Sequence, residues 1–281
     1  MWYQNLGTMV LIPKKSKVYM MDLKLKITSI LIFILFVIFD GCSTSPKVDT
    51  GKKAEPAIVI RAGSLYVGQL NRRITIDDVE NLSRIIEREK IEILTIQDLT
   101  RYPSVKSRLD LLDELNKRLG YRVVSGETET ISGRQVINAV LSNYPVLSHH
   151  NISFDKIKSS VFSGALLVSI DAGLEAVTLA SAKFPDESGS KDLARCVELI
   201  LGSNQDAKNP PIIVITGNLP QKADLGNSYL FKEIELKDSQ LTSKSRVWYT
   251  SSDSFKLLGR YITESKIGKI VVFEMAIFKK H

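Results

Sequence analysis

The stretch "NAVLSNYPVL", Asn138 to Leu147, joins an apolar run to a tight turn. Together with the two residues before it, the run "VINAVLS" is rich in branched apolar side chains and predicts a β-strand that ends at Ser142. One variable residue follows, and then Tyr144, Pro145 and an aliphatic residue. The segment is therefore expected to be a strand that enters a surface turn.

Further strand-like runs occur along the chain, and helix-like runs separate some of them. Apolar stretches of strand length lie at residues 57–67, 91–97, 121–125, 164–170, 174–182, 212–217, 245–250 and 269–278. Amphipathic stretches at 75–90, 105–120 and about 191–201 predict helices. Thr75 is a suitable N-cap for the first helix, and Gly120 is expected to end the second. The turn Asp171-Ala172-Gly173 predicts a hairpin. Crossover helices and hairpins in one uninterrupted region indicate a single α/β domain with a mixed sheet.

The composition is that of a globular protein, with 281 residues, 44% hydrophobic and 25% charged. Only two cysteines occur, Cys42 and Cys196, which excludes a disulfide scaffold. Cys196 lies at helical spacing from Leu193 and Leu199, so a small buried side chain is expected there. The net charge of +7 falls to +4 without residues 1–41, and this mild excess identifies no anionic partner.

Residues 1–41 carry the features of an export signal. Lys24 and Lys26 precede an apolar run of 13 residues, Ile27 to Phe39, which is long enough for a signal peptide but short for a membrane span. Cys42 follows Gly41 directly and is followed by Ser-Thr-Ser. This pattern resembles the lipobox of bacterial lipoproteins, although Phe39 and Asp40 replace its usual small or aliphatic residues.

The lipobox resemblance implies a signal peptide at 1–41 and a lipidated Cys42 as the mature N-terminus. The expected partner is then membrane lipid, and the expected location is the bacterial cell envelope after export from the cytoplasm. An uncleaved anchor and a soluble protein remain alternatives, and Met20 or Met21 is an alternative start. Residues 42–56 are rich in Ser, Thr, Pro, Lys and Gly and predict a flexible tether. The folded domain is therefore expected at 57–281.

The order of the segments resembles the endonuclease/exonuclease/phosphatase family over residues 58–278. "NAVLSNYPVL" is similar to that family's strand-and-turn signature, and "IEILTIQDLT" to its strand ending in Leu-Gln-Glu. "GALLVSIDAGLEAVTLASAKF" is similar to its central hairpin, and "PPIIVITGNLP" to the strand leading to Gly-Asp-Phe-Asn. The resemblance implies a DNase I-like, four-layer α/β/β/α sandwich of two mixed sheets. It also implies Mg²⁺-dependent hydrolysis of phosphoric esters.

The chain departs from the family's pattern where this chemistry would take place. The replacements are Tyr66 for an Asn, Asp98 for the metal-binding Glu, Lys183 for a His, Asn218 and Pro220 for the Asp and Asn after Gly217, and Ile267 for the last His. Asp98 keeps the carboxylate one methylene shorter and is the only, weak, metal candidate. The histidines of the chain, His149, His150 and His281, do not restore the missing His–Asp pair, because none lies at a matching strand end. His149 and His150 are expected to face solvent.

We therefore expect a lipid-anchored protein that keeps the fold as a non-catalytic binding or scaffold domain and needs no cofactor. The ammonium of Lys183 is expected to lie near Asp98 as an ion pair. Lys183, Lys266 and Arg195 are candidates for binding a phosphate or another anion, with solvated surface charges as the alternative. The sequence does not identify a protein partner.

The alternative function is a diverged Mg²⁺-dependent phosphodiesterase of nuclease, phosphatase or sphingomyelinase type. Such an enzyme would have to combine Asp98 with other acids, such as Asp186, Glu187 or Asp224. These acids lie in predicted loops, where they are most simply solvated charges.

Overall fold

The computed structural model of the chain describes residues 55–68, 72–105, 107–154, 163–185, 190–202, 211–218, 231–233, 246–250 and 252–279. The predicted signal peptide, Cys42 and most of the tether lie outside the described residues. Pro220, His281 and the three loop acids named above also lie outside them. Among the helices of the described part, none is both long and apolar enough to cross a membrane.

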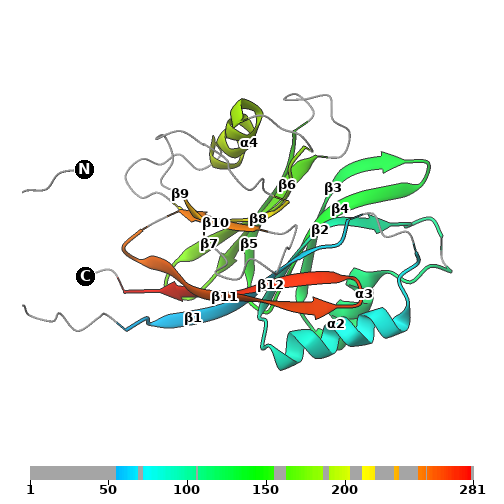
Figure 1. Cartoon of the computed structure of the whole chain (residues 1–281), viewed down its shortest axis with the longest axis horizontal. Coiled ribbons are helices and arrows are strands. Elements are labelled where there is room, and N and C mark those ends of the chain that lie inside the picture. The colour runs from blue at the N-terminus through cyan, green and yellow to red at the C-terminus, as the bar shows by residue number, and fades with distance from the viewer. Residues whose placement is uncertain are drawn as a thin grey trace, which may run out of the picture. The chain divides into compact units, whose positions relative to one another are not determined.

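Two six-stranded sheets form the centre of the domain (Figure 1). In the first sheet the order is β11-β12-β1-β2-β4-β3, and in the second it is β5-β6-β7-β8-β10-β9. The first sheet comprises β1 (Ile58–Tyr66), β2 (Ile93–Arg101), β3 (Arg122–Ile131), β4 (Arg134–Ser142), β11 (Phe255–Ser265) and β12 (Gly268–Ile277). The second comprises β5 (Val146–Ser153), β6 (Gly164–Asp171), β7 (Ala176–Lys183), β8 (Ile212–Gly217), β9 (Phe231–Glu233) and β10 (Arg246–Thr250). The pairs β1–β2 and β7–β8 are parallel and the other pairs antiparallel, so both sheets are mixed, as predicted.

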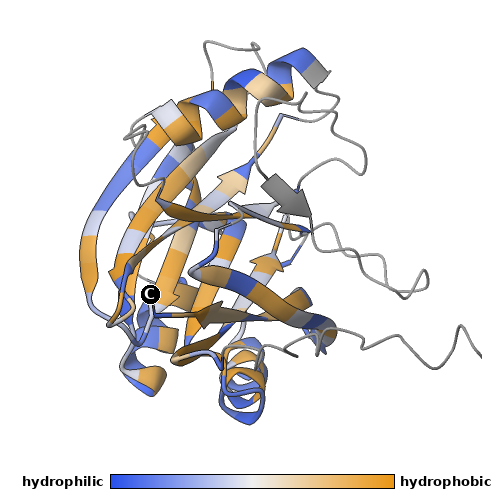
Figure 2. Ribbon diagram, turned by 90° about the vertical axis from the view of Figure 1, so that its left-hand side faces the viewer, coloured by the Kyte–Doolittle hydropathy of each residue, from blue (hydrophilic) through white to orange (hydrophobic). Residues whose placement is uncertain are grey.

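Helices cover the outer face of each sheet. Helices α2 (Ile76–Arg88) and α3 (Leu111–Leu119) pack on the first sheet, and α4 (Ser190–Gly202) packs on the second. Figure 2 shows α4 at the top, the other two helices at the bottom and the strands between them. Three apolar cores separate the layers, and the middle core joins the inner faces of the two sheets. The predicted four-layer α/β/β/α sandwich is confirmed.

Helix α2 begins as its sequence indicates. Thr75 is the N-cap: its hydroxyl accepts a hydrogen bond from the backbone N–H of Asp78, and the Asp78 carboxylate accepts one from the backbone N–H of Thr75. This reciprocal capping box satisfies two N–H groups that the helix leaves free. Asp78 is also paired bidentately with Arg72, and hydrogen bonds from Arg72 and Thr75 hold the pKa of its carboxyl well below the usual range. The helix start is therefore tied to the segment that precedes it.

The second predicted helix is shorter than its amphipathic pattern suggested. Helix α3 begins at Leu111, not near residue 105, because Asp110 is its N-cap and accepts hydrogen bonds from the backbone N–H groups of Leu112 and Asp113. Gly120 ends the helix in the left-handed conformation, at φ +69°, as predicted.

Strands β5, β9 and β11 were not predicted. Strand β5 lies at the edge of the second sheet and exposes Leu147, His149 and His150, so it lacks the alternation of apolar and polar residues that marks a half-buried strand. Its pairing with β6, rather than its own pattern, makes it a strand. The exposure of both histidines was predicted and is confirmed.

Candidate functional site

The side chains that face the opposite sheet change from apolar to polar along the strands. On β1, Ile60 and Ala62 belong to the core between the sheets, whereas Ser64, two residues on, is buried and polar. The same change occurs on three other strands. Apolar Ile93 is followed by Thr95 on β2, Leu179 by Ser181 on β7, and Val214 by Thr216 on β8. One end of the sandwich is therefore polar between the sheets.

Gln97 joins these polar side chains across the two sheets. Its amide group donates to the hydroxyl oxygens of Thr95 at 3.0 Å, Ser181 at 3.2 Å and Thr216 at 3.2 Å. The hydroxyl of Ser64 donates to the Gln97 carbonyl oxygen at 3.3 Å. All five side chains are fully buried, so these contacts replace hydrogen bonds to water that burial removes. We name these five side chains the buried polar floor. Asp98 directly follows Gln97 in the sequence.

Asp98 follows at a β-bulge in β2. The register with β4 shifts between Ile96 and Leu99, so Asn138 on β4 faces the irregular pair Gln97 and Asp98. Asp98 has φ +58°, in the left-handed region that an aspartate tolerates better than most residues. The Asn138 side-chain oxygen accepts from the Asp98 backbone N–H at 3.3 Å, and its amide nitrogen donates to the Gly164 carbonyl at 3.0 Å. A bulge of this kind re-aims a side chain, as often seen beside functional sites.

The Asp98 carboxylate is bound on both oxygens. The ammonium of Lys183, at the end of β7, donates to Oδ1 at 2.8 Å, and the hydroxyl of Tyr66, at the end of β1, donates to Oδ2 at 2.9 Å. Asp98 and Lys183 are only 3% and 7% exposed, so the pair is almost completely removed from water. The predicted contact between Lys183 and Asp98 is thus confirmed. We name Tyr66, Asp98 and Lys183 the Asp98 cluster.

The donor set of the Asp98 cluster does not suit Mg²⁺. That ion prefers about six oxygen ligands in near-octahedral geometry, and it usually combines one or two carboxylates with waters and phosphates. The cluster offers one carboxylate whose two oxygens already accept hydrogen bonds, with a cation directly beside it. At an effective dielectric constant of about 20, two like unit charges about 4 Å apart repel by about 4 kcal/mol. Among the described residues, no group of three or more His, Cys, Asp or Glu side chains is arranged to hold a metal ion.

The side chain of Asn218 forms hydrogen bonds with backbone groups. Its side-chain oxygen accepts from the backbone N–H of Phe184 at 2.7 Å, and its amide nitrogen donates to the Phe184 carbonyl at 3.0 Å. Phe184 directly follows Lys183, so this pair of bonds joins the ends of β7 and β8. Gly217 lies against the carbonyl of Ala182, and no larger residue fits there. The residues at this strand end therefore fix the position of the lysine.

Ile267 and Lys266 occupy the turn between β11 and β12. Ile267 is 3% exposed and packs in the core beneath α2 and α3, which gives it a structural role. The ammonium of Lys266 contacts Asp77 in the first turn of α2, and its backbone N–H donates to Asn81. Lys266 is thus engaged on the helix side of the turn, not with the carboxylate of Asp98.

Arg195 lies on the exposed face of α4, whereas Leu193, Cys196 and Val197 face the second sheet. It therefore belongs to the outer layer of the sandwich rather than to the polar end between the sheets. Cys196 is fully buried, and burial raises the pKa of its thiol to about 12. The thiol is accordingly protonated at neutral pH and behaves as a small apolar side chain, as expected from the sequence.

Reasoning from the sequence missed the buried polar floor and the role of Asn138. Thr95 and Gln97 lie two residues apart in an apolar strand, and Ser181 and Thr216 each interrupt another apolar strand; these polar residues are the signal that could have revealed the cluster. The partner of Asn138 gave no such signal, because it is the backbone of a bulged residue.

No protein-family model and no curated protein matches the chain. Solved structures do match. They include a humanised TDP2 from D. rerio with 14 mutations, at a TM-score of 0.59 and 13% identity, covering 77% of this chain and 98% of that one. An endonuclease/exonuclease/phosphatase protein from Bacteroides vulgatus matches at a TM-score of 0.59 and 10% identity, covering 78% and 99%. An endonuclease/exonuclease/phosphatase family protein from Leptotrichia buccalis matches at a TM-score of 0.57 and 12% identity, covering 78% of this chain and 100% of that one.

These similarities establish the architecture. The chain has the fold of the endonuclease/exonuclease/phosphatase proteins, which agrees with the resemblance found in its sequence. At such low identity, however, activity has to be argued from the residues of this chain.

Proposed function

We propose that this protein is a non-catalytic binding or scaffold protein built on an endonuclease/exonuclease/phosphatase-type sandwich. One observation carries the proposal: the carboxylate that would hold a metal ion is instead neutralised by Lys183 at 2.8 Å and capped by Tyr66. In a buried ammonium–carboxylate pair the two charges compensate each other. The carboxylate is then available neither as a metal ligand nor as a general base. The other positions where the family's chemistry would take place hold Asn218, engaged with backbone, and Ile267, engaged in a core.

The proposal includes export and a lipid anchor. The lysines and the apolar run before Cys42 support it, because they match the order of regions in a lipoprotein signal. The protein would then be held at the bacterial cell envelope by lipid on Cys42 and carry its domain on a short tether. Incorporation of a labelled fatty acid that persists in a Cys42→Ser variant would refute the anchor.

A second function, a diverged Mg²⁺-dependent phosphodiesterase, is favoured by one specific observation. Asp98 is held in a left-handed bulge at the end of a parallel strand, and structurally similar proteins include TDP2 described with a single-strand DNA product. Such an enzyme would need the Lys183 ammonium to leave the carboxylate on substrate binding. It would also need further oxygen ligands, because no group of three or more described His, Cys, Asp or Glu side chains is arranged to hold a metal ion.

Hydrolysis of a generic phosphodiester separates the two functions. We expect the full chain to hydrolyse bis(p-nitrophenyl) phosphate at the buffer rate with Mg²⁺ or with Mn²⁺, because the Asp98 carboxylate is already bound by Lys183 and Tyr66. The matched control is Asp98→Ala, whose near-ultraviolet circular dichroism checks that the fold is kept. Metal-dependent hydrolysis that disappears in Asp98→Ala would overturn the binding role and establish the phosphodiesterase.

A further inference from the structure

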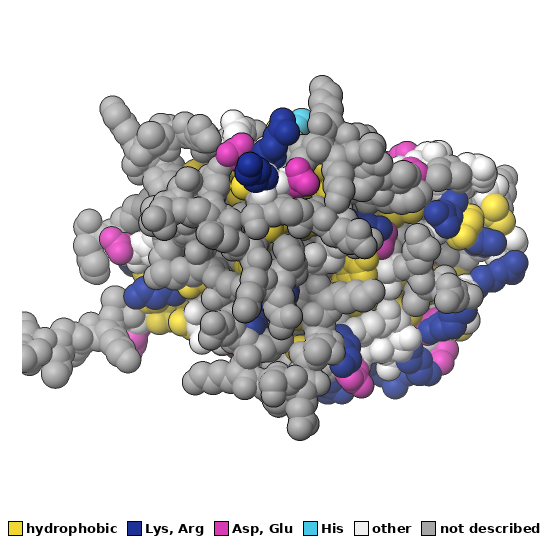
Figure 3. All heavy atoms as spheres, turned by 45° about the horizontal axis from the view of Figure 1, so that its top comes forward, with side chains coloured by type: hydrophobic (Ala, Val, Ile, Leu, Met, Phe, Trp, Pro, Cys, Tyr) yellow, Lys and Arg dark blue, Asp and Glu magenta, His cyan; other side chains and the backbone are white. Residues whose placement is uncertain are grey.

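A groove of about 600 Å³ lies beside the ends of β1 and β2, on the side of the first sheet that α2 and α3 cover. Its walls come from four places in the sequence: the residues just after β1, the segment that leads into α2, the segment from the end of β2 to α3, and the start of β4. Figure 3 shows basic side chains gathered at the right-hand end of the molecule, where Figure 1 places these elements. We name this space the arginine groove, after Arg72, Arg73, Arg108 and Arg134, which line it.

The charge of the arginine groove is largely uncompensated. No Asp or Glu is among the described residues that line it. Arg72 is neutralised by Asp78, with guanidinium–carboxylate distances of 2.6 and 2.8 Å. Arg73, Arg108 and Arg134 form no ion pair with any described residue. Three unpaired guanidinium groups therefore line one hollow that no described carboxylate lines, an arrangement that attracts anions.

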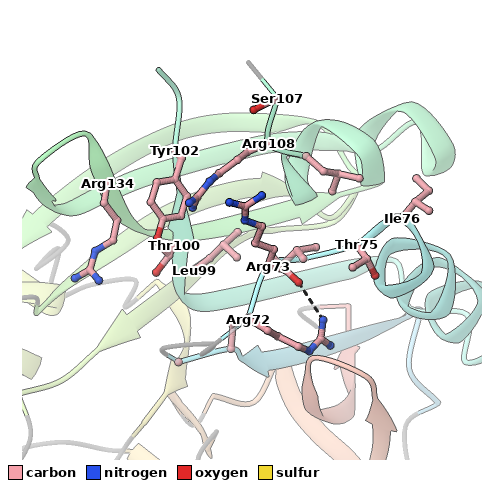
Figure 4. A pocket seen from close by; sticks show the side chains of 14 residues that line it. Arg72, Arg73, Thr75, Ile76, Leu99, Thr100, Tyr102, Ser107, Arg108 and Arg134 are labelled. Carbon is pink, nitrogen blue, oxygen red and sulfur yellow. Dashed lines mark hydrogen bonds between the residues drawn. The ribbon is translucent and has the colours of Figure 1, made fainter. Parts of the chain in front are cut away.

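The positions of these guanidinium groups suit the recognition of phosphate. Arg108 stacks on the ring of Tyr102, with its central carbon 3.5 Å from the ring centre, so its face is fixed while its N–H groups remain free to donate. Figure 4 shows Arg73 and Arg108 extending into the same space, with Arg134 on the far side of Tyr102. The hydroxyl groups of Thr100 and Ser107 also belong to residues that line the groove and add donors. Arginine forks of this kind bind phosphate oxygens in pairs.

Two acids, Asp110 and Asp113, line a neighbouring hollow that Arg108 also lines. In that hollow, Arg101 is paired with Asp110 at 2.5 Å and lies 3.8 Å from Asp113. Both carboxylates lie within ion-pair distance of Arg101 and neither does of Arg108, so Arg108 remains available to a ligand. The walls also include the buried apolar side chain of Leu99 and the partly buried side chains of Ile74 and Leu109, so a bound anion would be partly shielded from water.

We propose that the arginine groove binds a small molecule carrying at least two phosphate groups. Three unpaired guanidinium groups match the charge of a diphosphate better than that of a single phosphate. A hollow of about 600 Å³ is in the size range of small-molecule sites. The same chemistry is offered by a soluble nucleoside diphosphate and by a lipid headgroup with two phosphates. This inference rests on the binding role proposed above and assigns that role a place and a ligand class.

Calorimetric titration of inorganic pyrophosphate into the full chain, at low salt and with divalent metals chelated, tests the groove. We expect saturable binding that is stronger than the binding of inorganic phosphate. Arg73→Gln, Arg108→Gln and Arg134→Gln should each weaken it on the order of tenfold, because each removes a charge-assisted contact. The matched control is Arg84→Gln on the exposed face of α2, which should leave the affinity unchanged.

Two further probes identify the source of the diphosphate. Titration with ADP reports a soluble ligand, and sedimentation with phosphatidylcholine vesicles containing cardiolipin reports a lipid headgroup; either result should depend on the same three arginines. The proposal is overturned if pyrophosphate does not bind, if it binds no better than phosphate, or if the three variants behave like Arg84→Gln. Binding of a long oligonucleotide without binding of pyrophosphate would overturn the ligand class. Hydrolysis in the phosphodiester assay would refute the binding role alone, because this titration is made without metal.

Discussion

Replacing Lys183 by methionine is expected to lower the free energy of unfolding by about 3–5 kcal/mol, the usual cost of removing one partner of a buried ion pair. Methionine keeps the length of the side chain, so the loss comes mainly from leaving the Asp98 carboxylate buried without its cation. Denaturant-induced unfolding of the full chain at neutral pH measures the effect through the transition midpoint. The double variant Asp98→Asn with Lys183→Met should recover most of the loss, because neither charge then remains in the interior.

The matched control for this experiment is Lys117→Met on α3. Lys117 is also paired with a carboxylate, Glu114, at 2.7 Å, but its side chain is 69% exposed. Surface pairs of this kind contribute roughly 0–1 kcal/mol. If Lys183→Met costs no more than Lys117→Met, the carboxylate of Asp98 does not depend on the lysine, and the description of the Asp98 cluster is wrong.

Gly217→Ala is expected to cost at least about 3 kcal/mol, at the upper end of the range for overpacked sites. A Cβ atom at this position would lie 1.9 Å from the carbonyl oxygen of Ala182 on the neighbouring parallel strand. The backbone cannot yield there without separating β7 from β8. Lys183 and Asn218 are the next residues along the two strands, so the change would also disturb the Asp98 cluster.

Gly259→Ala provides the control for Gly217→Ala. Gly259 is also a strand glycine, on β11, but an added Cβ would meet no atom within 4 Å. Its substitution should change the free energy of unfolding by less than about 1 kcal/mol, and in the stabilising direction if its backbone suits alanine. Comparable unfolding midpoints for the two variants would show that β7 and β8 can part at little cost.

Most of the architecture could be predicted from the sequence because the strands and helices carry strong apolar patterns. Strand β11 could not be predicted, and the reason is a local irregularity in its pairing. Phe255 and Leu257 pack toward the middle core, but a bulge between Leu257 and Gly259 inserts one extra residue, so the next inward residue of this core is Ile262. The alternation changes phase within one strand, and a pattern of period two no longer describes it.

The candidate site was predictable in part. Placing the strands in order brought Lys183 toward Asp98, and the structure confirms that contact. The same reasoning made Lys266 a candidate for binding an anion, yet its ammonium contacts Asp77. The left-handed bulge at Asp98 left no trace in the sequence, because it depends on how β2 and β4 pair around Asn138. The arginine groove could not be predicted either, because its residues come from separate segments of the sequence that only the fold brings together.

The central claim is that Lys183 and Tyr66 hold the carboxylate of Asp98 in the place of a metal ion. Calorimetric titration of Mg²⁺ into the full chain at neutral pH tests it most directly. We predict no heat beyond that of dilution through the millimolar range, because binding would require the ammonium to leave a buried carboxylate. Saturable binding of one Mg²⁺ per chain that is lost in a folded Asp98→Asn variant would contradict the claim.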